Sequence, residues 1–201
     1  MKWILPLHYF GSTEYWAAIV QGGENVVIDL GENYVKRSER NRTTILASEG
    51  TLQLSVQLAH ANRPRQPMRS MLIDYSKRWQ HQHFVAIESA YRSSPYYDYY
   101  GERFHDLYDK EWKYLIDLNM ATLERMCKIL KLPVPQISTE YITAKEGDID
   151  MRAKNPAQLF TPKPYIQVFS DRIPFEPNLS IFDLVMCEGP AATDILLKSK
   201  L

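Results

Sequence analysis

The stretch WILPLHYFGSTEYWAAIVQGGENVVID, residues 3–29, decides the fold class. It opens with a short apolar run, Trp3–Leu7, which predicts a buried strand. Turn and capping residues follow, so that Ser12 or Thr13 begins a helix over Glu14–Gln21, where apolar residues recur at helical spacing. A glycine pair ends this helix, and Asn25–Asp29 is a second apolar strand. A strand, a loop, a helix and a strand in this order predict the opening of an α/β sheet.

The rest of the chain changes between strand-like and helix-like patterns. Leu52, Leu54 and Val56 alternate with polar residues, as in a strand with one face in water. Ser180 with Asp183 three residues later predicts a capping box. The expected elements, in chain order, are a hairpin of Thr43–Ala47 and Thr51–Leu58, a strand at Met71–Ile73, helices from Trp79 to Ser94, from Tyr96 to Lys110 and from Glu111 to Leu130, a strand at Ile137–Thr143, a polar connection at Ala144–Pro164, a strand at Tyr165–Phe169, a helix at Ile181–Glu188 and a last helix after Pro190. They predict a mixed sheet in an α/β fold whose middle and C-terminal parts are mostly helical.

Length, composition and charge narrow the class further. The 201 residues are 45% hydrophobic and 24% charged, with a formal net charge of zero, which predicts one folded domain over residues 1–201. The chain is neutral and has no known motif for recognising a nucleic-acid sequence, which argues against nucleic-acid binding. Cys127 and Cys187 form no disulfide framework, and Cys127 falls on an apolar helical face. Because no signal-peptide pattern opens the sequence and no apolar run reaches about 20 residues, we expect a cytoplasmic protein without a membrane span.

Basic residues concentrate in one part of this neutral chain. From Lys36 to Arg78, nine Lys and Arg residues stand against three Asp and Glu residues. The densest segment, Glu32–Arg42, follows the second predicted strand, at the carboxyl edge where open α/β sheets bind ligands. Because guanidinium groups bind phosphate through two parallel donors, we expect a small ligand that contains phosphate or sugar; a solvated loop is the alternative. The candidate binding residues here are Asn33, Tyr34, Lys36, Asn41 and Arg42.

Three residues are candidates for proton transfer. His8 ends the first predicted strand, where it would act as a general base or would simply pack at the strand end. Glu32 belongs to the charged segment. Glu88 falls on an otherwise apolar helical face, where it would have a raised pKa or a structural partner. His81 and His83 are two apart, so they cannot chelate one ion from a helix, and we predict no metal site. No dinucleotide or P-loop motif identifies a cofactor.

Short blocks spread along the chain resemble one protein family. They are Tyr9-Phe10-Gly11 with Glu14-Tyr15, Glu32-Asn33-Tyr34 and Lys36 with Asn41-Arg42, Ala90-Tyr91 with Ser94-Pro95-Tyr96, Tyr99-Tyr100, Leu118-Asn119, Tyr165 with Gln167-Val168-Phe169, Asn178-Leu179-Ser180-Ile181 with Asp183-Leu184, and Glu188-Gly189-Pro190. In this order they resemble the WbqC-like protein family over nearly the whole chain.

The resemblance implies a role rather than a mechanism. The family takes its name from genes in clusters for O-antigen and related surface polysaccharides, which implies work on an activated sugar. It supplies no settled catalytic residues. Within its blocks, Tyr9, Tyr91, Gln167 and Asn178 are further candidates for substrate binding. His8 stands where similar sequences have a small residue, and this departure puts its catalytic role in doubt.

Two functions therefore fit the sequence. The first is a transferase or other sugar-modifying enzyme that holds a sugar nucleotide or sugar phosphate through its Arg/Lys-rich loop, with tyrosines stacked on sugar or base. The second is a non-catalytic protein of the same pathway that binds a ligand or a partner, which predicts an exposed tyrosine patch around Tyr96–Tyr100. Acyl transfer through a nucleophile has no supporting motif. The sequence sets neither the substrate nor the oligomeric state.

Overall fold

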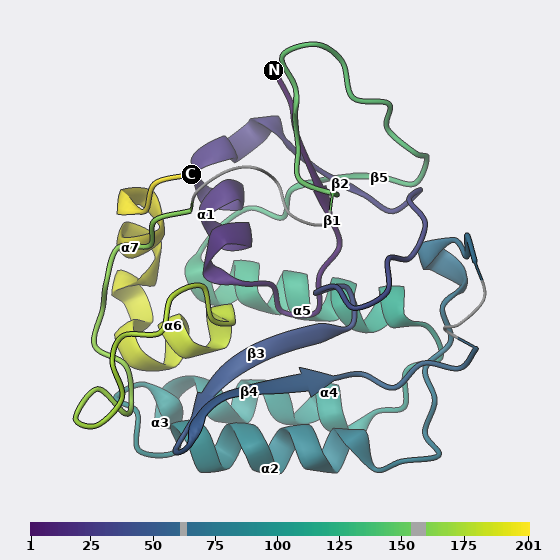
Figure 1. Cartoon of the computed structure of the whole chain (residues 1–201). Coiled ribbons are helices and arrows are strands. Elements are labelled where there is room, and N and C mark those ends of the chain that lie inside the picture. Colours follow the sequence, from purple (N-terminus) through teal and green to yellow (C-terminus); the bar gives the residue numbers. More distant parts are fainter. Residues whose placement is uncertain (61–63, 154–159) are drawn as a thin grey trace.

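The computed structural model describes residues 1–60, 64–153 and 160–201 (Figure 1). Residues 61–63 of the basic segment, with Arg63, and residues 154–159 of the polar connection lie outside the described residues. The main sheet has the order β5-β2-β1-β6, and each neighbouring pair is parallel. Its strands are β1 (Trp3–Pro6), β2 (Val26–Asp29), β5 (Gln136–Ser138) and β6 (Ile149–Asp150). The predicted α/β class is confirmed.

The opening unit forms as the sequence predicts. Helix α1 (Thr13–Gly22) connects β1 to β2, and Ser12 caps it by accepting a hydrogen bond from the Tyr15 N–H at 3.5 Å. The turn before it places Phe10 and Gly11 at positive φ, 61° and 73°. A Cβ on Gly11 would lie 2.5 Å from the Tyr15 ring, so this close approach requires glycine.

A second, antiparallel sheet stands apart from the first. Strands β3 (Arg42–Ala47) and β4 (Gly50–Ser55) form the predicted hairpin, although the second strand stops at Ser55. In the view of Figure 1 the main sheet lies above α5 (Leu115–Leu130) and this hairpin lies below it. The buried Asn119 of α5 connects the two layers, because its amide donates to the backbone oxygens of Arg40 at 2.7 Å and Leu7 at 3.4 Å.

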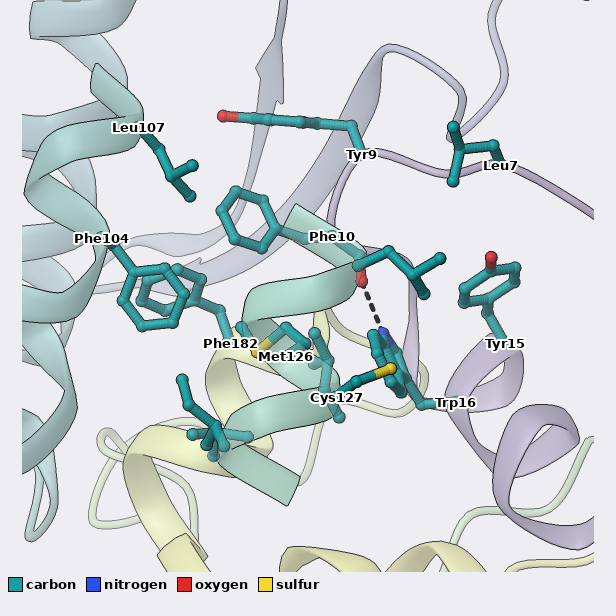
Figure 2. Close-up of a cluster of buried hydrophobic side chains, with 14 of the residues drawn as sticks. Leu7, Tyr9, Phe10, Tyr15, Trp16, Phe104, Leu107, Met126, Cys127 and Phe182 are labelled. Atoms are coloured by element: carbon teal, nitrogen blue, oxygen red, sulfur yellow. Dashed lines mark hydrogen bonds between the residues drawn. The ribbon is translucent and has the colours of Figure 1, made fainter. Parts of the chain in front are cut away.

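Helices make up the middle and the C-terminal part, as predicted. The longest is α5, whose stripe of buried side chains includes Leu123, Met126 and Cys127, so Cys127 packs as a small apolar residue. One hydrophobic cluster extends from Leu5 in β1 to Leu196 in α7, and Figure 2 shows its aromatic part. The helices are α2 (Trp79–Tyr91), α3 (Tyr97–Tyr100), α4 (His105–Asp109), α5 (Leu115–Leu130), α6 (Ile181–Glu188) and α7 (Ala192–Lys198), with 3-10 turns at Gly23–Asn25, Met68–Ser70, Gly101–Phe104 and Gly189–Ala191. Among the described residues, no helix has the length and apolar character needed to cross a membrane.

Some sequence-based boundaries were wrong. Met71–Ile73 makes only isolated bridges, to Leu58 and Tyr114, and is no strand. The predicted strand at Ile137–Thr143 pairs only over Gln136–Ser138, and the predicted helix from Glu111 begins at Leu115. The helical stretch from Tyr96 to Lys110 is broken into short turns.

The largest error concerns Tyr165–Phe169, which is a loop and not a strand. This segment is held by side-chain hydrogen bonds, and not by the backbone hydrogen bonds of a sheet. The Gln167 amide binds the backbone of Glu176 in both directions, at 2.8 and 2.9 Å, and it also reaches the carboxylate of Asp183 at 3.3 Å. Asp183 is fully buried, accepts from Tyr91 at 2.9 Å and from Tyr165 at 2.7 Å, and does not close the predicted capping box.

Candidate functional site

The topology of the main sheet singles out one place for a ligand. From the central β1 the chain moves through α1 to β2 and β5 on one side, whereas β6 joins the other side of β1. The strand order therefore changes direction between β1 and β6, and open α/β sheets bind ligands at the carboxyl ends of such strands. His8 follows β1 and Arg152 follows β6. Both residues line a cleft of about 370 Å³.

Two buried ion pairs support this cleft. The guanidinium of Arg40 binds both carboxylate oxygens of Glu32, at 2.7 and 2.5 Å, with side chains only 3% and 5% exposed. Burial raises the pKa of Glu32, and the hydrogen bonds and charge of Arg40 oppose this rise without cancelling it. Glu32 does not line the cleft; it fixes Arg40, which does.

The second pair joins the ends of β2 and β6. Arg152 contacts the buried Asp29 carboxylate and binds Asp150 at 2.8 and 2.5 Å. Asp29 also accepts from the Gly31 N–H at 2.8 Å, and a Cβ on Gly31 would lie 2.0 Å from the backbone nitrogen of Tyr141. Arg152 also donates to the backbone oxygen of Ile142 at 2.7 Å, in the segment that passes closely over Gly31.

Acidic side chains and a histidine line one part of the cleft. His8 Nδ1 lies 3.2 Å from a carboxylate oxygen of Glu39, and its ring lies 4.6 Å from the ring of Tyr15, centroid to centroid. Burial raises the pKa of Glu39, but the hydrogen bonds and the charge of His8, with Ser12, outweigh burial and leave this pKa below its usual value.

Glu14 is the second acid of the cleft, in the first turn of α1. Asn178 holds it twice, because its side-chain oxygen accepts from the Glu14 N–H at 3.0 Å and its NH2 group donates to the Glu14 carboxylate at 3.1 Å. Asn178 has a φ of 55°, in the left-handed region that Asn tolerates. Burial raises the pKa of Glu14 more than Asn178 lowers it, and the nearby Glu39 charge adds to the rise.

Two of the arginines that line the cleft, Arg37 and Arg42, have no carboxylate partner among the described residues. Arg42 donates to Gln53 at 3.2 Å, but its buried Nε finds no acceptor among the described residues. In the described part of the chain, neither Arg42 nor Arg37 forms an ion pair within 4.0 Å. The hydroxyl of Tyr15, which faces the His8 backbone, also completes no hydrogen bond there. Buried polar groups without partners are rare, and both Arg42 Nε and the Tyr15 hydroxyl belong to residues that line this cleft.

The structure brings together three of the predicted site residues, His8, Arg42 and Asn178, in the lining of the cleft. Two more lie behind it: the Tyr34 hydroxyl donates to Asn41 at 2.8 Å, and the Asn41 amide donates to the backbone oxygen of Val56 at 2.9 Å. Asn33 and Lys36 are exposed on the same loop.

The other predicted residues lie elsewhere. Tyr9 is fully buried and shares its hydroxyl with His83 and Tyr108, at 3.1 and 2.9 Å. Tyr91 and Gln167 belong to the buried cluster around Asp183. Glu88 is 38% exposed and lies 3.8 Å from Arg92, so α2 does not bury it as its position on the helix predicts.

Sequence reasoning missed five charged residues of the cleft. Arg37, Glu39 and Arg40 belong to the segment already singled out, and their charge was the available signal. Glu14 is an acidic residue in the first turn of a predicted helix, which stabilises the helix but does not indicate a binding site. Arg152 gave no signal, because its partner Asp29 is 123 residues away. In the described ranges, no group of three His, Cys, Asp or Glu residues is arranged to hold a metal ion.

Comparison with known proteins adds one match. No curated protein and no solved structure matches this chain. The model of the WbqC-like protein family matches residues 8–160, which include β2, the hairpin and every cleft residue except Asn178. The match confirms the resemblance seen in the sequence, and the chain belongs to the WbqC-like protein family.

Proposed function

We propose that this chain binds a sugar phosphate or a sugar nucleotide in the cleft and acts on the sugar as a transferase or related sugar-modifying enzyme of surface-polysaccharide assembly. The observation that carries the proposal is the buried Nε of Arg42 without an acceptor, beside Arg37, which no carboxylate neutralises within the described residues. A phosphate offers acceptor oxygens to both guanidinium groups at once. The place of the cleft, at the switch point of the sheet, supports the same conclusion.

The cleft also holds groups that can move a proton. Glu39 contacts the ring of His8 at Nδ1, and a histidine oriented by a carboxylate can act as a general base. In a transfer reaction His8 would take the proton of an acceptor hydroxyl. The hydroxyl oxygen would bond to the anomeric carbon, and the phosphate oxygen would leave with the electron pair of the broken bond. Glu32 and Glu88 have no part in this proposal.

One observation favours the non-catalytic alternative. Tyr99 is 70% exposed, and the rings of Tyr96 and Tyr100 lie 6.2 Å apart, centroid to centroid, beside it. An exposed aromatic group of this kind suits a protein partner. Under this alternative the tyrosines, and not the cleft, would be the functional surface.

A thermal-shift series separates the two functions. A sugar nucleotide at a hundredfold excess over its Kd adds about 2.7 kcal/mol, or about 5 to 10 °C in a chain of this size. We expect a shift with sugar phosphates or nucleotide sugars that Arg42→Ala reduces and that Arg69→Ala, an exposed cation outside the cleft, leaves unchanged. No shift with any compound of this class would contradict the proposal and favour the tyrosine surface.

A further inference from the structure

The charges of the cleft are of both signs and are not paired with each other. Glu14 and Glu39 line the same cleft as Arg37 and Arg42, yet within the described residues no ion pair within 4.0 Å joins the two sets. By contrast, Arg40 and Arg152, which line the same cleft, form buried ion pairs with Glu32 and Asp29, which do not line it. Two arginines of the cleft are therefore neutralised from behind, whereas Arg37 and Arg42 have no carboxylate partner within 4.0 Å among the described residues.

Among the described residues, no Lys or Arg forms an ion pair with Glu14 or Glu39 within 4.0 Å. The basic group that contacts this acidic part of the cleft is His8, whose Nδ1 lies 3.2 Å from Glu39. Within the described ranges, the one hydrogen-bond donor to the Glu14 carboxylate is the neutral amide of Asn178. Two carboxylates that share a site without a cation repel each other, and a bound ammonium group relieves that repulsion.

We propose that the cleft selects a phosphorylated sugar that carries a free amino group, with Arg37 and Arg42 on the phosphate and Glu14 on the ammonium. This inference rests on the proposed function and names its substrate class. A neutral sugar would fill the same cleft and use the same arginines, but it would bring no cation to the carboxylate of Glu14. Glu14 is then the residue that determines specificity, and Asn178 is the residue that positions its carboxylate.

Protons released on binding give a second readout of the contact between Glu14 and the ammonium group. Burial raises the pKa of Glu14, so this carboxyl keeps its proton to a higher pH than an exposed glutamate does. An ammonium group beside it favours the ionised form, so binding of an amino sugar releases protons that binding of a neutral sugar does not release. A purely structural Glu14 would show no difference between the two ligands.

Matched ligands make the test. Isothermal titration calorimetry on the full chain compares glucosamine 1-phosphate, glucose 1-phosphate and N-acetylglucosamine 1-phosphate, and then the uridine diphosphate forms of the same three sugars. The variants are Glu14→Gln, which keeps the size and an acceptor for Asn178, and Glu124→Gln, an exposed control on α5. We expect the amine to bind about tenfold more tightly than its hydroxyl and acetamide counterparts, because a charge-assisted hydrogen bond replaces a neutral one. Glu14→Gln should reduce this ratio to about one without weakening the neutral sugars, and Glu124→Gln should leave it unchanged.

Each other outcome has a definite meaning. Equal affinities for the three sugars in the wild-type chain would overturn the amino-sugar inference and leave the proposed function standing. A preference for the amine that survives in Glu14→Gln would overturn the role of Glu14. If none of the six ligands binds, the proposed function is contradicted, and the amino-sugar inference is contradicted with it. Circular dichroism of the folded Glu14→Gln chain guards against a loss of binding through unfolding.

Discussion

The buried pair of Glu32 and Arg40 gives the sharpest prediction on stability. Both side chains are about 5% exposed or less, and their two hydrogen bonds are short. Removing one member of such a pair costs about 3 to 5 kcal/mol, because the remaining charge is buried without its partner. In a chain of this size this corresponds to about 6 to 20 °C in Tm. We expect Glu32→Gln to fall in this range in urea unfolding at pH 7.

The reverse variant should behave differently with pH. In Arg40→Met the buried carboxyl of Glu32 can take up a proton, and burial already raises its pKa. A group with a raised pKa in the folded state contributes stability below its unfolded pKa and loses that contribution as the pH rises. Arg40→Met should therefore be less destabilised near pH 4.5 than at pH 7, relative to wild type, whereas Glu32→Gln has no such relief because arginine keeps its proton.

The double variant completes the cycle. Glu32→Leu with Arg40→Met should recover most of the loss, less about 1 kcal/mol for the Arg152 carbonyl that Arg40 also binds at 3.1 Å. Single variants within 1 kcal/mol of wild type, or losses that simply add in the double variant, would refute the reasoning.

Three further predictions follow from other buried groups. Asp29→Asn should lower the free energy of unfolding by about 3 kcal/mol, because the buried Arg152 then faces a neutral side chain. Backbone hydrogen exchange should become faster in the segment that leads to Arg152, and unchanged exchange would contradict the role of Asp29 in holding this segment. Burial lowers the pKa of His83 to about 4, so the unfolded chain takes up the proton first as pH falls, and up to about 3 kcal/mol of stability should be lost between pH 6.5 and 4. His83→Gln should flatten this part of the pH dependence of urea unfolding relative to wild type, and an equal slope in both chains would exclude His83 as its source. Asp183→Ala should cost about 3 kcal/mol by calorimetry, because it leaves the hydroxyls of Tyr91 and Tyr165 without their acceptor, and a near-wild-type Tm would contradict that.

Local signals explain what the sequence predicted well. The cap at Ser12, the helical spacing after it and the apolar run before it all act within about 20 residues, so the opening unit could be read directly. The stripe on α5 and the alternation in the hairpin are equally local. These elements are defined by neighbours in the sequence, and their prediction needs no knowledge of the tertiary structure.

Distant contacts explain what was missed. Strand β6 has two residues and exists because Trp3 and Ile4 pair with it, across more than a hundred residues. Gln167 has a strand-like setting in the sequence, but the buried Asp183 and the Glu176 backbone hold it in a loop.

In the candidate site, too, residues with local signals could be predicted, and residues placed by distant contacts could not. Arg42 could be predicted from the local surplus of charge. The place of Glu14 in the cleft depends on Asn178, which is 164 residues away in the sequence, so the helix that carries Glu14 could be predicted but not its role in the site.

The most direct test of the central claim is an amide chemical-shift map of the chain on addition of uridine diphosphate glucose. The proposal predicts saturable changes confined to the cleft, at His8, at Ser12 and over Arg37–Arg42, with loss of these changes in Arg42→Ala. Changes centred instead on the exposed tyrosines near Tyr99, or none at concentrations up to millimolar, would contradict the assignment of this cleft as the binding site.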